Sequence, residues 1–177
     1  LASSAASDVY KRQEIMDKKY DVILVGAGPA GIFSAYELIK KDPTLKVLLV
    51  EKGNDIYSRK CPILAKKADK CPSTGTCYPS CSMTSGFGGC GAYSDGKFNI
   101  TSEFGGWMTD YLSEEEVLDL IRYVDTINLE HGAPKELTDP YTKEVYDIER
   151  KGIAHGLKLL RSEVRHLGTE VNLQVLK

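Results

Sequence analysis

The sequence has 177 residues, of which 42% are hydrophobic and 27% are charged, with a net charge of -2. A chain of this length can bury a core of its own or form part of a larger domain. The balanced charge gives no basic surface for nucleic acid, and no apolar stretch approaches the roughly 18 residues that span a bilayer. We therefore expect a cytoplasmic protein that binds neither nucleic acid nor membranes, and the sequence leaves its oligomeric state open.

Both ends of the chain differ from the rest. Residues 1–13 are polar and aperiodic and resemble a translated library-adaptor sequence, so residues 1–15 are interpreted as a non-native or disordered leader. At the other end, Thr169 is predicted to be the N-cap of a helix that runs through Leu176 without a C-cap. We therefore expect a fragment that is truncated at its C-terminal end.

The first regular elements follow a β-α-β pattern. Tyr20–Val25 is a short apolar run, typical of a parallel strand buried on both faces. A helix is predicted from Pro29 to about Lys41, because apolar residues recur at helical spacing and proline is tolerated in a first turn. A second apolar strand follows over Lys46–Val50. This order predicts an α/β fold that begins with a Rossmann-like unit.

A G-x-G-x-x-G sequence joins the first strand to the helix. Its first glycine allows a tight turn, the second lets a pyrophosphate approach the backbone, and the third lets helix and strand pack closely. Glu51 ends the second strand, where it would bind ribose hydroxyls and repel the 2′-phosphate of NADP. The sequence therefore predicts a dinucleotide site, with a ligand-free turn as the alternative. The predicted site contains Gly26, Gly28, Pro29, Ala30, Gly31, Glu51 and Lys52.

A second glycine-rich stretch covers Ser85–Lys97. Ordered glycines lose much backbone entropy, which indicates close approach to a ligand, with an unusual turn as the alternative. In flavoproteins such a stretch runs along the pyrophosphate toward the flavin, so it favours FAD over NAD. Arg59 could reach the adenosine or the pyrophosphate, or be an ordinary solvated arginine. The predicted cofactor site therefore also includes Arg59, Gly88, Gly89, Cys90 and Gly91.

All five cysteines lie between residues 61 and 90, without a C-x-x-C pair. This spacing matches neither a zinc ribbon nor a ferredoxin-type cluster. Free thiols in an ordered loop and a redox disulfide near the flavin both stay open. We favour a loop without metal. The metal alternative would use Cys61, Cys71, Cys77 and Cys81.

The remainder of the chain is predicted to be mainly helical. Ser113 and Glu116 form a capping box that opens a helix ending near Gly132. Another helix is expected over about 144–163, although its two glycines weaken it. We therefore expect an FAD-binding part over residues 16–100 and an incomplete helical region over residues 101–177.

Four stretches together resemble one family. These are Arg59–Pro62, the cysteine-bearing loop, the glycine-rich string over Ser85–Lys97, and Arg165–Glu170. They are similar to a group of largely uncharacterised bacterial FAD-dependent dehydrogenases with a glutathione-reductase-like FAD fold. The resemblance covers about residues 19–177. Cys90 departs from the family pattern, where alanine is expected, so a required catalytic role for this thiol does not follow.

The resemblance implies an oxidoreductase that holds FAD at the glycine fingerprint, Glu51 and the 88–91 loop. It also implies further chain that completes the FAD sheet. We expect a small-molecule substrate. An NAD(P)H electron donor, where one is used, would bind at a site outside this fragment. Catalytic residues and the substrate stay unknown, and we expect this fragment alone to be inactive. The alternatives are an NAD-dependent dehydrogenase and a dinucleotide-binding protein with a cysteine-loop metal site and no redox turnover.

Overall fold

The computed structural model describes residues 18–71, 77 and 80–177, so the leader expected over residues 1–15 lies outside the described residues. The chain divides into two compact units, one up to Cys90 and one from Gly91. Each unit contains helix and strand, so the fold is mixed α/β, as predicted. In the part of the chain that the structure describes, no helix is long and apolar enough to cross a membrane.

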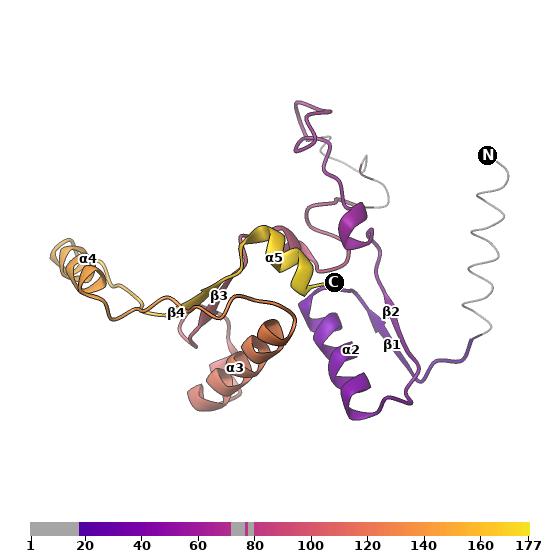
Figure 1. The fold of residues 1–177 in the computed structure, drawn as a ribbon, viewed down its shortest axis with the longest axis horizontal. Coiled ribbons are helices and arrows are strands. Elements are labelled where there is room, and N and C mark those ends of the chain that lie inside the picture. Colours follow the sequence, from indigo (N-terminus) through magenta and orange to yellow (C-terminus); the bar gives the residue numbers. More distant parts are fainter. Residues whose placement is uncertain (1–17, 72–76, 78–79) are drawn as a thin grey trace. The chain divides into compact units, whose positions relative to one another are not determined.

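The N-terminal unit contains the expected β-α-β arrangement (Figure 1). β1 (Val22–Val25) and β2 (Val47–Val50) pair in parallel, and α2 (Pro29–Lys41) connects them and packs on both. The predicted helix has these same bounds, and both strands begin slightly later than predicted. A short 3₁₀ helix, η1 (Ile56–Ser58), follows and contributes a buried isoleucine.

The two faces of β1 differ in exposure. Val22 and Leu24 are half-buried, whereas Ile23 and Val25 are 60% and 87% exposed. The sequence predicted a strand buried on both faces, and within the described residues this prediction is wrong. Successive side chains of a strand point to opposite faces of the sheet. In the described part of this unit α2 packs on the sheet, so the side chains on the face that α2 does not cover are exposed.

The C-terminal unit contains a two-stranded antiparallel sheet that the sequence pattern did not predict. β3 (Lys97–Ile100) pairs with β4 (Glu163–His166). α3 (Glu114–Glu130) packs against β3, and the predicted capping box at its start is confirmed by reciprocal bonds between Ser113 and Glu116. The buried apolar residues of this unit are Ala92, Val117, Ile127, Ala133 and Leu167.

α4 (Lys143–Ala154) is shorter than predicted. Gly156 has a φ of +74°, and the amide of Leu157 donates back to the Gly152 carbonyl at 2.9 Å. This is the usual way for a glycine to end a helix, so the prediction of one helix over 144–163 is wrong in its second half.

The last helix also begins earlier than expected. α5 (Gly168–Val175) has Leu167 as its N-cap, not Thr169. Two further 3₁₀ helices are η2 (Cys90–Tyr93) and η3 (Met108–Asp110). The region over residues 101–177, predicted to be mainly helical, therefore also contains the strand β4 and the 3₁₀ helix η3.

Candidate functional site

The first glycine turn joins β1 to α2. Gly26 has a φ of +100°, and its amide donates to the Val50 carbonyl at 2.7 Å, which fixes the turn to the end of β2. A Cβ on Gly31 would lie 1.9 Å from the Gly26 carbonyl oxygen. Helix and turn therefore approach as closely as the fingerprint predicts. Gly31 requires glycine because of this contact, and Gly26 requires it because of its positive φ.

Gly28 is not required by the protein's own packing. Its φ of -77° suits any residue, and apart from its chain neighbours no atom of the described residues lies within 4 Å of where its Cβ would stand. Pro29 and Ala30 begin α2, whose first turn carries no acidic side chain. The first amides of a helix lack helical acceptors and favour anions. A bare backbone at Gly28 therefore lets a phosphate approach this helix end.

The Glu51 carboxylate lies between the two glycine segments. Its Oε2 accepts a hydrogen bond from the Ala27 amide at 2.8 Å, and its Oε1 accepts from the amides of Gly53 at 2.9 Å and Gly86 at 3.0 Å. The Ala27 and Gly53 amides are the main causes that hold the pKa of Glu51 below its usual value. A carboxylate offers about four lone-pair positions, so Oε2 keeps one acceptor position for a hydroxyl group.

The second glycine segment packs against the first. The amide of Gly88 donates to the Ala27 carbonyl at 2.8 Å. A Cβ on Gly89 would lie 3.3 Å from the Cα of Gly28 and 3.6 Å from the Cδ of Pro29. The structure therefore brings together two glycine motifs that are far apart in the sequence.

Gly53 is a site residue that the sequence analysis did not single out. A Cβ at this position would lie 2.4 Å from the amide nitrogen of Gly86, so the two backbones touch. The available signal was a glycine placed directly after Glu51-Lys52, at the end of a strand. Lys52 itself has an exposed side chain.

Arg59 lies on the protein side of the second glycine segment and is only 4% exposed. Its guanidinium donates to the carbonyls of Ser82, Met83, Phe87 and Gly89 at 2.7–2.9 Å. Arg59 is therefore not the solvated arginine of the alternative interpretation. Its contact with adenosine or pyrophosphate stays a prediction.

Cys90 and Gly91 lie on either side of the division between the two units. The Cys90 thiol is free and exposed. A Cβ on Gly91 would meet no atom of the described residues within 4 Å, its chain neighbours aside. The predicted cofactor contacts of both residues stay predictions.

The structure does not gather the loop cysteines. Cys61 and Cys77 are half-buried, Cys71 and Cys81 are exposed, and all four are free thiols. Within residues 18–71, 77 and 80–177, no three His, Cys, Asp or Glu side chains are placed to hold a metal ion. A hydrogen bond with the Thr84 side chain is the main cause that lowers the pKa of the Cys81 thiol.

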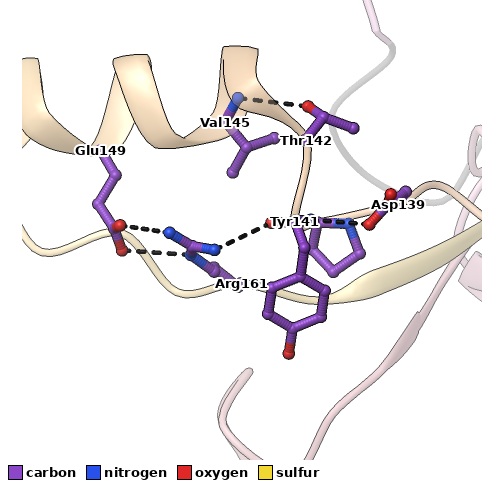
Figure 2. A network of polar contacts seen from close by, with 7 residues as sticks. Asp139, Tyr141, Thr142, Val145, Glu149 and Arg161 are labelled. Carbon is purple, nitrogen blue, oxygen red and sulfur yellow. Dashed lines mark hydrogen bonds and ion pairs between the residues drawn. The ribbon is translucent and has the colours of Figure 1, made fainter.

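Figure 2 shows a polar network in the C-terminal unit. Arg161 forms an ion pair with Glu149 and donates to the Pro140 carbonyl at 3.4 Å, and its guanidinium carbon lies 4.1 Å from the centre of the Tyr146 ring. The bond to Glu149 is the main cause that raises the pKa of Arg161. These bonds tie α4 to the segment before β4, so we interpret the network as stabilising.

Comparison with known proteins gives one partial similarity. A stretch of 56 residues, 32% of the chain, is 38% identical to "L-2-hydroxyglutarate dehydrogenase, mitochondrial" of Dictyostelium discoideum, and it spans 12% of the length of that protein. No family model and no solved structure matches the chain. The chain is therefore similar in part to a dehydrogenase.

Proposed function

We propose that the protein is an FAD-dependent oxidoreductase, and that this chain carries the half-site for the ADP part of the cofactor. The observation that carries the proposal is the Glu51 carboxylate, which binds the amides of Ala27 and Gly86 and so joins both glycine segments. The partial similarity to a dehydrogenase supports the oxidoreductase class.

The residues present fit such a cofactor. Glu51 Oε2 would accept a ribose hydroxyl, and the backbone at Gly28 and the first turn of α2 would hold the pyrophosphate. Gly88 and Gly89, which contact the glycine turn between β1 and α2, would also lie beside the cofactor. The flavin supplies the redox chemistry when it is bound, and the protein binds and orients it.

Two features support FAD over the nicotinamide cofactors. The second glycine segment is bonded to the first through Gly88 and Ala27, which gives a long cofactor a second backbone surface. Glu51 has a lowered pKa, so it is ionised near neutral pH and would repel the 2′-phosphate of NADP. NAD itself stays the main alternative, because it uses the same β-α-β unit.

Equilibrium titration of the purified full-length protein with FAD, ADP, NADH and NADPH tests the proposal. We expect FAD and ADP to bind and NADPH to be excluded. Binding of NADH without uptake of FAD would favour an NAD-dependent dehydrogenase, and binding of none of them would refute the dinucleotide site. L-2-hydroxyglutarate, the compound in the name of the partially similar protein, is the first reductant to add to a flavin-loaded sample, with loss of visible flavin absorbance as the signal.

A further inference from the structure

Four carbonyl groups in residues 82–89, which lead into and include the start of the second glycine segment, accept hydrogen bonds from one side chain. Nε of Arg59 donates to Ser82, Nη1 to both Phe87 and Gly89, and Nη2 to Met83. Four of the five N–H groups of the guanidinium are therefore given to the main chain of one segment. Arg59 is 4% exposed, and its bond to Ser82 is buried, whereas the bonds to Met83, Phe87 and Gly89 are partly buried.

The amide groups of the same segment are also bonded within the N-terminal unit. Gly86 donates to Glu51, Phe87 to the Asn54 carbonyl at 3.1 Å, and Gly88 to the Ala27 carbonyl. Both kinds of main-chain group in the segment are thus bonded: carbonyls accept from Arg59, and amides donate to other residues of the N-terminal unit. The position of the segment relative to the first glycine turn depends on both sets of bonds.

The shape that these bonds impose is unusual. Gly86, Gly88 and Gly89 have φ values of +118°, +86° and +62°, a region that side chains rarely adopt. A Cβ on Gly86 would lie 2.7 Å from the Cδ of Arg59, so the arginine stem lies directly against this glycine. The absence of a side chain at Gly86 therefore leaves room for the Arg59 stem.

We propose that Arg59 is a positioning residue of the dinucleotide site. It fixes the backbone of Gly86–Gly89 beside Gly28 and Glu51, and it does this through the main chain instead of through a phosphate. This inference rests on the proposed function. Lysine cannot replace Arg59 in this role, because an ammonium group is a point charge without the planar fork that serves several carbonyls at once.

Arg59→Lys, which keeps the charge, and Arg59→Gln, which removes it, test this inference, with Lys60→Gln as the matched control. Lys60 is the exposed neighbour with the same charge. We measure hydrogen exchange of the 85–89 amides without nucleotide, and the FAD dissociation constant at several salt concentrations. Both Arg59 variants should lose protection at 85–89 and bind FAD about 10- to 100-fold more weakly, because one buried and three partly buried carbonyls lose their donor. Their salt dependence and the behaviour of Lys60→Gln should match the unaltered protein.

Three results would overturn the inference. If Arg59→Lys keeps FAD affinity while Arg59→Gln loses it with a shallower salt dependence, the guanidinium charge acts on the phosphates. If the 85–89 amides stay protected in both variants, the segment does not depend on Arg59. If protection falls equally in β1 and β2, Arg59 is a general stabilising residue.

Gly86→Ala tests the same contact from the opposite side while Arg59 stays in place. Its Cβ would meet the Cδ of Arg59 at 2.7 Å and the carbonyl oxygen of Asn54 at 2.6 Å. We expect the same local loss of protection and a similar loss of FAD affinity, and normal FAD binding by this variant would overturn the inference. Failure of the unaltered protein to bind FAD would refute the proposed function, and the exchange data would still report on the arginine contact itself.

Discussion

The two units use charged side chains in different ways. In the N-terminal unit, Glu51 binds three backbone amides and Arg59 binds four backbone carbonyls. In the C-terminal unit, Arg165 binds the Asp125 carboxylate at 2.5 and 2.7 Å, and Arg161 binds Glu149. Arg165 and Arg161 also donate to the carbonyls of Pro134 and Pro140, but each of them pairs with a carboxylate on a helix, α3 or α4. The bonds of Glu51 and Arg59 to main chain shape a loop, whereas these ion pairs tie a helix to a later segment of the chain.

This difference separates building a site from stabilising a fold. The pair between Arg165 and Asp125 connects β4 to α3, and the bond to Asp125 is the main cause that raises the pKa of Arg165. Substitutions in the C-terminal pairs should therefore change stability, and substitutions around Glu51 and Arg59 should change ligand binding as well. The following predictions test this contrast, from the largest expected effect to the smallest.

Asp125→Ala should have the largest effect on stability. It leaves the guanidinium of Arg165, whose side chain is 4% exposed, buried without its carboxylate, which costs about 3–5 kcal/mol. Urea unfolding followed by circular dichroism measures the loss. The double variant Asp125→Leu with Arg165→Met is the control and should recover most of the stability, because an apolar pair of similar volume often replaces a buried ion pair. A loss below about 1 kcal/mol for Asp125→Ala would contradict the assignment of this pair as a structural tie.

Gly31→Ala and Gly28→Ala should separate folding from binding within one motif. The Cβ at Gly31 collides with the backbone of Gly26, so we expect destabilisation of about 1–3 kcal/mol or more. The Cβ at Gly28 meets no atom of the described residues beyond its neighbours, so its stability should change by no more than about 0.5 kcal/mol while FAD binding weakens. Parallel urea unfolding and FAD titration of both variants measure this. Equal effects of the two substitutions on stability would show that Gly28 also serves packing.

Glu51→Gln should flatten the pH dependence of stability. The folded state lowers the pKa of Glu51, so its contribution is present above the unfolded pKa and is lost as the pH falls through the folded pKa. The free energy of unfolding, measured from neutral pH to about pH 3, should fall more steeply for the unaltered protein than for Glu51→Gln. Glu116, whose pKa is also lowered, is the same in both proteins and cancels in the difference. Identical pH profiles would show that the three amide bonds do not stabilise the ionised carboxylate.

Glu149→Gln should have the smallest effect. The side chains of Arg161 and Glu149 are more exposed than those of Arg165 and Asp125, so solvent screens their attraction. We expect a smaller loss than for Asp125→Ala, and the loss should shrink further at high salt. Urea unfolding at low and high salt measures both. A salt-independent loss as large as that of Asp125→Ala would mean that the two pairs are equivalent.

The sequence predicted the elements that depend on local signals. The bounds of α2 follow from Pro29 and from helical spacing, and the capping box of α3 follows from Ser113 and Glu116. The glycine fingerprint likewise predicted the turn at Gly26 and the close contact at Gly31, because each glycine has its own steric requirement.

Elements that depend on distant partners were not predictable in this way. β3 and β4 are four-residue strands whose pairing joins Lys97 to His166, and nothing near either strand indicates the other. The contact between Gly53 and Gly86 and the four carbonyls on Arg59 are also long-range. The early end of α4 was a local event, since Gly156 supplied it, but helical periodicity outweighed that signal in the prediction.

The bonds of Arg59 to main-chain carbonyls have a consequence for how this segment can evolve. Every residue type offers the same carbonyl oxygen, so Ser82, Met83 and Phe87 can change their side chains without losing the contact. Arg59 has no such freedom. In an alignment of relatives we therefore expect this arginine to vary little. We also expect pairwise covariation not to detect its partners, because a substitution at a partner position does not change the carbonyl group that Arg59 binds.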